Sequence, residues 1–95
     1  MNEQRQSDTE IIDDVRQKIL PLFKVILHND DFNSTIFVTE TLMRVFRISV
    51  TQAEEKMWEA HKNQCSIICI ENFEVAEFHR DCLHSYGLTS TIEPA

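Results

Sequence analysis

The sequence lacks long hydrophobic runs and a signal-like beginning, and each absence argues against a class of protein. No stretch approaches the roughly 18 consecutive apolar residues of a membrane-spanning helix. Residues 1–10, MNEQRQSDTE, have neither the basic region nor the apolar region of a secretory signal. We therefore expect a soluble, cytoplasmic protein that has no membrane partner.

Positive charge is also scarce. There are 9 Lys and Arg residues against 16 Asp and Glu residues, so the formal net charge is −7. Such a surface repels a phosphate backbone, which argues against nucleic acid as the main partner and favours a partner that carries positive charge. The 95 residues have room for one small domain with one core, and we expect a monomer.

Cysteines are few, and their number is odd. In a chain with no export signal, Cys65, Cys69 and Cys82 predict free thiols rather than a disulfide framework. On a strand, Cys65 and Cys69 would lie roughly 13 Å apart, and a helix would bring together only His79 and Cys82. Because structural zinc takes four ligands, we expect packing and surface roles for these residues, with no metal and no cofactor.

The strands are predicted from short apolar runs bounded by turn residues. They are expected at about residues 23–28 (FKVILH), 65–70 (CSIICI) and 88–93 (LTSTIE). Between the first two strands, the apolar residues change from strand spacing to helical spacing. The predicted element order is therefore βααβαβ.

Three helices are predicted from apolar residues at helical spacing. The first runs from about residue 35 to residue 46. The second begins after Ser49, which forms a capping-box pattern with Gln52. The third begins after Asn72 and ends before Gly87. The predicted buried faces consist of Val38, Leu42, Val45 and Phe46 in the first helix, Ala53, Met57, Ala60 and His61 in the second, and Val75, Phe78, Cys82, Leu83 and Tyr86 in the third.

This element order predicts an α+β fold, in which three helices pack on a small three-stranded antiparallel sheet. Residues 1–20 are polar and mixed in charge with few apolar residues, and we expect them to be a flexible N-terminal tail. Residues 21–95 are expected to form the folded core domain.

Two places break the pattern that builds the core. Asn29, Asp30 and Asp31 follow a strongly apolar strand, although a turn needs only one or two such residues. The second helix is expected to return antiparallel to the first, which predicts that His61 lies close to Asn29 and Asp31. Amide, carboxylate and imidazole acceptors around a gap suit a primary ammonium group, whose three N–H donors need acceptors once they leave water.

Both features also have simpler interpretations. Asn-Asp-Asp before a helix serves as an N-terminal cap, where the helix dipole stabilises each carboxylate by roughly 0.3–1 kcal/mol. A histidine on an apolar face is often a core residue whose hydrogen bonds are satisfied. Their predicted convergence, with an apolar hollow formed by Val38, Met57 and Ala60 between them, is what indicates a binding site.

Four segments resemble the ClpS adaptor family in their order and spacing. They are FKVILHNDDF, the run Met57-Trp58-Glu59-Ala60-His61, the EVAE of residues 74–77 and the closing GLTSTIEPA. In that family the motifs KVxLxNDD, MxxxH and EVAE recur, and the resemblance covers about residues 21–95. Its members are N-recognins: they bind polypeptides that begin with a large hydrophobic destabilising residue, the N-degron, and deliver them to the AAA+ unfoldase of a Clp protease.

The resemblance implies a role for each matched residue. The α-ammonium group of the substrate would be bound by Asn29, Asp31 and His61, while Asp30 supports the turn or contacts the next peptide unit. The pocket for the first side chain would be lined by Thr35, Val38, Met57, Ala60 and Leu88. The face that docks the N-terminal domain of the unfoldase would contain Glu74, Glu77 and His79.

The sequence departs from the family at three places. Members usually have a methionine six residues after the Asn of NDD, where this chain has Thr35, and a valine is common where Ala60 stands. The family's HxxGxxxxG glycines are absent from HKNQCSIIC. Because the loss of a methylene-sized wall changes discrimination by only about 1–3 kcal/mol, these departures predict a wider or differently selective pocket rather than lost binding.

Other classes of function stay open on the residues alone. A hydrolase has no nucleophile with a base beside it here, because Cys65 begins a strand beyond the helix that carries His61. A scaffold domain resembling the C-terminal domain of the ribosomal stalk protein has a similar βααβαβ order, but it binds through a basic, glycine-bearing helix that this acidic chain lacks. A ClpS-like protein with altered N-terminal residue specificity is the third alternative.

Overall fold

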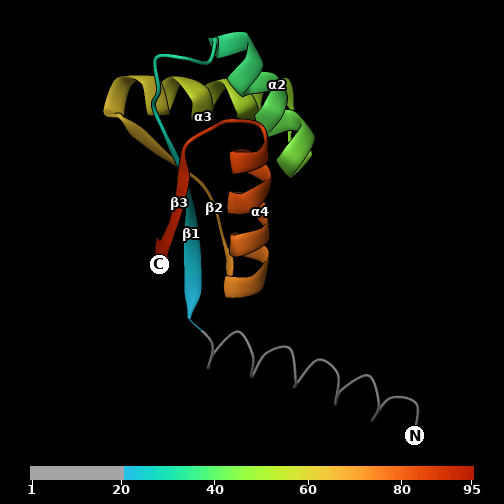
Figure 1. The fold of residues 1–95 in the computed structure, drawn as a ribbon, viewed down its shortest axis with the longest axis vertical. Coiled ribbons are helices and arrows are strands. Elements are labelled where there is room, and N and C mark those ends of the chain that lie inside the picture. The colour runs from blue at the N-terminus through green and yellow to red at the C-terminus, as the bar shows by residue number, and fades with distance from the viewer. Residues whose placement is uncertain (1–20) are drawn as a thin grey trace, which may run out of the picture.

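A computed structural model describes residues 21–95 of the chain (Figure 1). In chain order its elements are β1 (Leu22–His28), α2 (Thr35–Phe46), α3 (Val50–Asn63), β2 (Cys65–Asn72), α4 (Phe73–Ser85) and β3 (Ser90–Pro94). The predicted βααβαβ order and the α+β class are therefore confirmed. The tail expected over residues 1–20 lies outside the described residues.

The sheet has the strand order β2-β1-β3, and β1 pairs antiparallel with both neighbours. The pairing of β1 with β2 shifts between Val25 and Ile26, whose partners are Cys69 and Ile67. Ile68 is therefore the extra residue of a β-bulge. The bulge changes which side chains of β2 face the helices, and period-two spacing was not enough to predict it.

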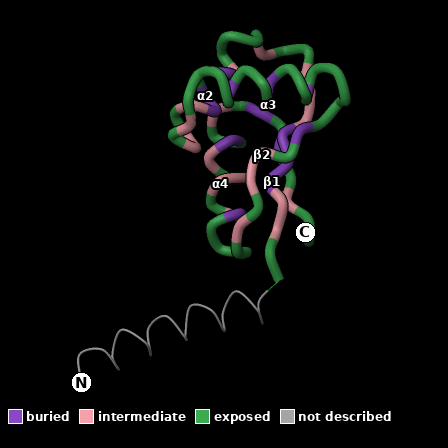
Figure 2. The backbone as a smooth tube through the Cα atoms, turned by 180° about the vertical axis from the view of Figure 1, so that it is seen from behind, coloured by how far each residue is buried: buried purple, intermediate pink, exposed green. Residues whose placement is uncertain are grey.

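The helices cover the sheet from two directions. The long axis of α4 follows the strands along one face, whereas α2 and α3 lie across the end of the sheet where β1 finishes (Figure 1). Buried positions of β1, α3 and α4 meet between these layers (Figure 2). The core that they form contains Val25, Leu27, Leu42, Ala53, Met57, Ala60, Ala76, Leu83 and Leu88.

Each helix begins at a side-chain cap, and the caps of α3 and α4 are those that the sequence predicts. The Ser34 hydroxyl accepts a hydrogen bond from the backbone N–H of Phe37, which starts α2. The capping box of Ser49 and Gln52 is present at the start of α3. At the start of α4, the Asn72 side chain accepts a hydrogen bond from the helix backbone.

Gly87 ends α4 as predicted, because its φ of 82° lies in the left-handed region that favours glycine. The backbone N–H groups of Gly87 and Leu88 donate to the carbonyl oxygens of His84 and Leu83, at 2.9 and 3.0 Å. This turn directs Leu88 into the core, where the residue is 3% exposed. The paired strand consequently begins at Ser90, two residues later than expected.

Two predicted buried faces are wrong in part. On α4, Val75 and Phe78 are exposed, while Ala76 and Leu83 are fully buried. Ala76 and Leu83 are seven residues apart and so lie on one side of the helix, and this side, rather than the one with Val75 and Phe78, faces the core. On α3, Ala60 occupies the core and His61, about 100° further around the helix, is exposed.

Among residues 21–95, no helix is both long enough and apolar enough to cross a membrane.

Candidate functional site

The loop between β1 and α2 is held in shape by Asp30. Its Oδ1 accepts hydrogen bonds from the backbone N–H groups of Phe32 and Asn33, at 3.0 and 2.8 Å. The Asn33 side-chain amide also donates to Oδ2 of the same carboxylate, at 3.1 Å. The Asp30 carboxylate therefore points into the turn and makes the turn rigid.

Asn33 also links this loop to the far end of the chain. Its Nδ2 donates to the carbonyl oxygen of Gly87 at 3.1 Å, immediately before Leu88. Sequence reasoning missed Asn33, because a turn asparagine has many local roles and nothing in the local pattern reveals a partner 54 residues away. The bond places the loop beside the connection that carries Leu88.

A backbone hydrogen bond brings the end of α3 to the start of the loop. The N–H of Asn29 donates to the carbonyl oxygen of Gln64 at 2.8 Å. Gln64 is the C-cap of α3 in the left-handed conformation, and His61 lies three residues before it, in the last turn of that helix. The loop and the helix end that carries His61 are thus joined directly.

The remaining polar side chains of this region are available to a ligand. Within residues 21–95, the side-chain hydrogen bonds of the loop involve Asp30, Asn33 and Ser34, and none involves the side chain of Asn29 or Asp31. Asp31 and His61 are exposed, and Asn29 is half-buried. The His61 ring stands edge-on to Trp58, with the ring centroids 5.6 Å apart.

Helix ends give this region a favourable electrostatic arrangement. Asp30 and Asp31 lie just before the N-terminus of α2, where the partial positive charge of the helix stabilises carboxylates. His61 lies in the last turn of α3, where the carbonyl oxygens carry partial negative charge. A cation bound between the two elements would therefore meet carboxylate, amide, imidazole and carbonyl acceptors.

The expected pocket residues lie beneath this region. Met57, Ala60 and Leu88 belong to one cluster of core residues, and the half-buried Val38 packs against it. They come from α2, α3 and the connection between α4 and β3. Four of the five residues expected to surround the first side chain of a substrate thus belong to the core or pack against it.

The fifth, Thr35, is exposed and opens onto a groove between α2 and α3. The groove has a volume of about 540 Å³, and Met57 lines it as well. Its walls are formed by Thr35, Ile36, Thr39, Glu40, Met43, Val50, Glu54, Met57 and Trp58. Thr35 and Met57 therefore lie where the groove meets the core. The groove itself was not predicted from the sequence.

The residues expected to dock a partner are on α4, and their environments differ. Glu74 is exposed, whereas the Glu77 carboxylate lies 3.8 Å from the Arg80 guanidinium group. His79 is half-buried, and its Nδ1 lies 2.6 Å from the Glu71 carboxylate. Of these three residues, Glu74 is thus the most available to a protein partner.

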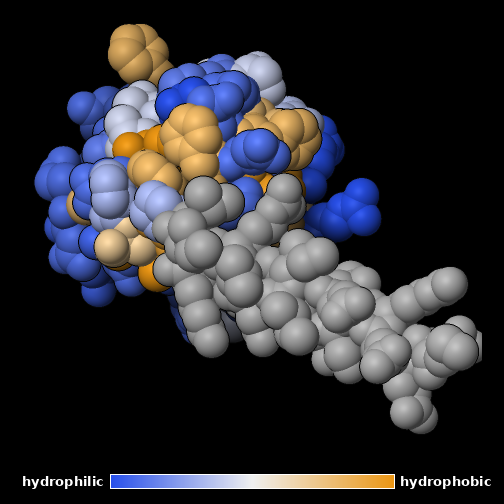
Figure 3. All heavy atoms as spheres, turned by 90° about the horizontal axis from the view of Figure 1, so that it is seen from below, coloured by the Kyte–Doolittle hydropathy of each residue, from blue (hydrophilic) through white to orange (hydrophobic). Residues whose placement is uncertain are grey.

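Exposed apolar side chains surround the beginning of α4. They come from the start of β1, the end of β2 and the first turns of α4, and are Leu22, Ile70, Phe73, Val75 and Phe78. Figure 3 views the molecule from this end and shows exposed apolar side chains, in orange, among blue polar ones. An exposed apolar patch that contains aromatic side chains is typical of a protein-binding face.

Among the described residues, one group of side chains could hold a metal ion, namely Cys69, Glu71 and His79. These residues come from β2 and α4 rather than from the β1–α2 loop.

Comparison with known proteins agrees with this architecture. Residues 18–91 match the family described as "ATP-dependent Clp protease adaptor protein ClpS". The ATP-dependent Clp protease adapter protein ClpS of Synechococcus elongatus is 42% identical over 80 residues, which cover 83% of this chain and 84% of that protein. The corresponding protein of Gloeobacter violaceus is 38% identical over 81 residues, covering 84% and 87% of the two chains.

A solved structure has the same fold. The structure of Agrobacterium tumefaciens ClpS2 bound to L-phenylalaninamide matches with a TM-score of 0.70 and 31% sequence identity, covering 79% of this chain and 98% of that one. The family match, the identities and the shared fold lead to one conclusion: this chain belongs to the ClpS family of ATP-dependent Clp protease adaptor proteins.

Proposed function

We propose that this protein is an adaptor that binds polypeptides by a large hydrophobic N-terminal residue and delivers them to the AAA+ unfoldase of a Clp protease. The observation that carries the proposal is the hydrogen bond from Asn29 to Gln64, which joins the acceptor-rich loop to the helix end bearing His61. Acceptors from two separate elements can then surround one small cation.

In this proposal the cation is the α-ammonium group of the substrate. With a pKa of about 7.7–8.0, this group is mostly protonated at neutral pH. Its three N–H groups would donate to the side chains of Asn29, Asp31 and His61, directly or through water. Asp30 has a different task, because its carboxylate already accepts hydrogen bonds from the turn.

The first side chain of the substrate would enter the apolar region below. Met57, Ala60 and Leu88, with Val38 beside them, supply the contact surface. Thr35 would stand at its edge, where the groove between α2 and α3 begins. Burying a Leu or Phe side chain there stabilises the complex by about 1.5–3 kcal/mol, which makes the identity of the first residue decisive.

The ligand of the Agrobacterium relative supports this assignment. L-phenylalaninamide has a free α-amine and an aromatic side chain, and a carboxamide takes the place of the next peptide bond. It therefore represents the first residue of a polypeptide, and the proposed acceptors and apolar region fit those groups one by one.

Delivery is assigned to the beginning of α4. Exposed Glu74 and its neighbour Glu77 lie among the apolar side chains of Phe73 and Phe78, and such a surface suits the N-terminal domain of the unfoldase. The proposed role of His79 is to support this face, because the residue is half-buried against Glu71. We further propose that the protein works as a cytoplasmic monomer and has no catalytic activity of its own.

A panel of peptides that differ only in their first residue tests the proposal. Fluorescence polarisation should show tight binding for Leu, Phe, Tyr and Trp, and weaker binding by at least about tenfold for Gly, Asp or Lys. A scaffold domain would bind the whole panel equally, and a hydrolase would convert the peptides to products. Either result would reject the proposed function.

A further inference from the structure

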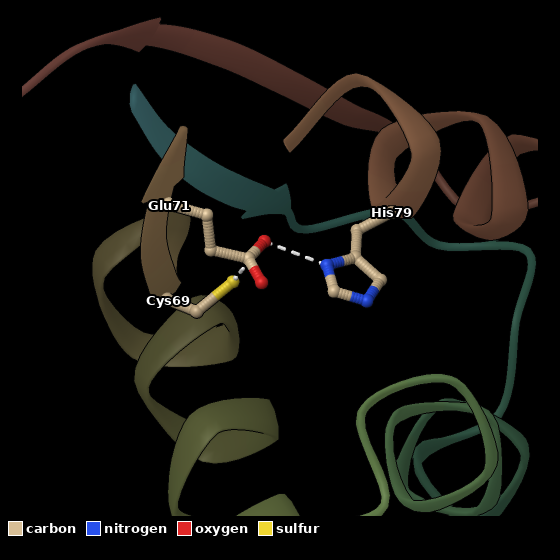
Figure 4. A group of neighbouring side chains, drawn as sticks. All are labelled: Cys69, Glu71 and His79. Atoms are coloured by element: carbon tan, nitrogen blue, oxygen red, sulfur yellow. Dashed lines mark hydrogen bonds and ion pairs between the residues drawn. The ribbon is translucent and has the colours of Figure 1, made fainter. Parts of the chain in front are cut away.

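Three side chains with metal-binding atoms meet between β2 and α4 (Figure 4). The Glu71 carboxylate lies between the other two: its Oε1 is 3.1 Å from the Cys69 thiol sulfur and 2.6 Å from His79 Nδ1. One ligand atom from each residue lies within 4.8 Å of the other two. All three residues are half-buried.

The fold brings these residues together in two steps. Cys69 and Glu71 are two residues apart on β2, so their side chains project from the same face of the sheet. The chain then turns directly into α4, which packs against the sheet and returns His79 to that face. The His79 ring is also packed against Phe46 of α2, with ring centroids 4.6 Å apart, and this contact restricts its orientation.

The ligand types and spacing suit zinc. Zinc is bound by thiolate sulfur, imidazole nitrogen and carboxylate oxygen at about 2.3, 2.0–2.1 and 2.0–2.2 Å. In a tetrahedral site these bond lengths place the ligand atoms about 3.4–3.6 Å from one another. Here the Glu71 oxygen lies 2.6 Å from the His79 nitrogen and 3.1 Å from the Cys69 sulfur, and all ligand atoms lie within 4.8 Å of one another. Small rotations of the side chains would bring these atoms to the distances of a zinc site.

We propose that Cys69, Glu71 and His79 form a zinc-binding site that links β2 to α4. A water molecule would complete the four-coordinate shell. The site is separate from the loop that contains Asn29 and Asp31, so the proposal does not depend on the proposed substrate binding. The sequence suggested two other pairs of ligands, Cys65 with Cys69 and His79 with Cys82. Neither pair predicts this combination of residues.

Charge balance is favourable at this site. When zinc binds, the Cys69 thiol loses its proton to solvent, and thiolate and carboxylate together offset the two positive charges of the ion. Burial and the hydrogen bond to Glu71 raise the pKa of the free Cys69 thiol, so this proton is present at neutral pH before zinc arrives. In the 2.6 Å contact with the Glu71 carboxylate, His79 Nδ1 carries a hydrogen, and this hydrogen is lost to solvent or moves to Nε2 when zinc binds.

Alkylation of the three cysteines tests the proposal within one molecule. The full chain is treated with N-ethylmaleimide with and without zinc chloride, and the modification of each cysteine is measured by peptide mass spectrometry. Zinc should slow the modification of Cys69 by at least about tenfold and leave Cys65 and Cys82 unchanged. Equal protection of all three cysteines, or of none, would overturn the proposal.

Variants test the identity of the ligands. Cys69→Ser and His79→Gln should each weaken zinc affinity by at least about tenfold in a competition titration with a chromogenic chelator. The matched controls Cys65→Ser and His84→Gln should retain the natural affinity. Cobalt in place of zinc should give a thiolate-to-metal absorption band that disappears in Cys69→Ser, and circular dichroism confirms that each variant is folded. Zinc affinity unchanged in Cys69→Ser would show that the three residues form only a hydrogen-bonded group.

Discussion

Asp30 and Asp31 are neighbours in the chain but have different environments. The Asp30 carboxylate accepts hydrogen bonds from the turn, whereas Asp31 is exposed and makes no side-chain hydrogen bond within residues 21–95. Two adjacent residues of one type should therefore respond oppositely to substitution. Asp30 should matter for stability, and Asp31 should matter for binding.

The first prediction compares the two residues directly. Asp31→Ala should weaken binding of a free-amine Leu peptide by about tenfold or more and leave the free energy of unfolding nearly unchanged. Asp30→Ala should lower that free energy by about 1–2 kcal/mol, because the N–H groups of Phe32 and Asn33 lose their acceptor. Fluorescence polarisation and urea denaturation measure the two effects. If Asp31→Ala unfolds early yet binds normally, Asp31 contributes to the stability of the fold and not to ligand binding.

The second prediction concerns Thr35, which is exposed at the edge of the groove. A longer side chain at this position would reach across the opening and exclude β-branched first residues. Thr35→Met should therefore reduce binding of peptides that begin with Val or Ile relative to one that begins with Leu, by about 1–3 kcal/mol. Thr35→Ser serves as the size control. An unchanged ratio in both variants would remove Thr35 from the pocket.

At the residue scale, sequence reasoning identified polar groups more easily than their partners. The excess acceptors in the turn pointed to Asn29 and Asp31, and the expected return of the second helix brought His61 toward them. Asn33 was missed, because its bond to Gly87 spans 54 residues and depends on the packing of the C-terminal segment. The burial of His61 was wrong for a related reason: a stripe 100° wide cannot tell which of two adjacent residues faces the core.

At the scale of the elements, the turn after α4 is hydrogen-bonded to the β1–α2 loop of the candidate site. Gly87 has a φ of 82°, and its carbonyl oxygen accepts the hydrogen bond from Asn33. No atom lies within 4 Å of a Cβ built on this glycine, so a substitution there meets backbone strain rather than a clash. A substitution at Gly87 therefore changes stability through the backbone conformation and not through side-chain packing.

The third prediction tests this effect of the backbone conformation. Gly87→Ala should lower the free energy of unfolding by about 1–2 kcal/mol, the cost of a left-handed conformation for a residue with a Cβ. Gly87→Asn should cost less, because asparagine tolerates this conformation. Urea denaturation of both variants measures the difference. Equal losses would show that strain at Gly87 is not the cause.

The elements were predictable where local chemistry determines them. The caps Ser49 and Asn72 and the stop at Gly87 form hydrogen bonds within a few residues and are as expected, and the first helix begins at the expected residue. The bulge in β2 and the rotation of α4 depend on contacts between elements, so local patterns did not reveal them. The group formed by Cys69, Glu71 and His79 depends on both features.

At the scale of the whole molecule, substrate binding and partner docking are assigned to opposite ends. The β1–α2 loop lies at the end capped by α2 and α3, whereas α4 begins at the far end beside the start of β1 (Figure 1). The two ends are separated by the length of the sheet and of α4. Charge changes at the beginning of α4 should therefore leave the loop intact.

The fourth prediction tests this division. The double variant Glu74→Lys/Glu77→Lys should bind peptides with unchanged affinity and lose delivery of a Leu-first substrate in a degradation assay with the Clp unfoldase and peptidase. A control variant, Glu55→Lys, adds positive charge at an exposed position of α3, away from the beginning of α4, and should retain delivery. Loss of peptide binding in the first variant would contradict the separation of the two faces.

The central claim is that this ClpS-family protein recognises the free N-terminus of a polypeptide. The most direct test compares a Phe-first peptide with its N-acetylated form by fluorescence polarisation against the full chain. Acetylation removes the positive charge and two N–H donors but keeps the side chain. We expect the free peptide to bind at least about tenfold more tightly, since Asn29, Asp31 and His61 have no cation to bind in the acetylated peptide. Equal affinity for the two peptides would contradict it.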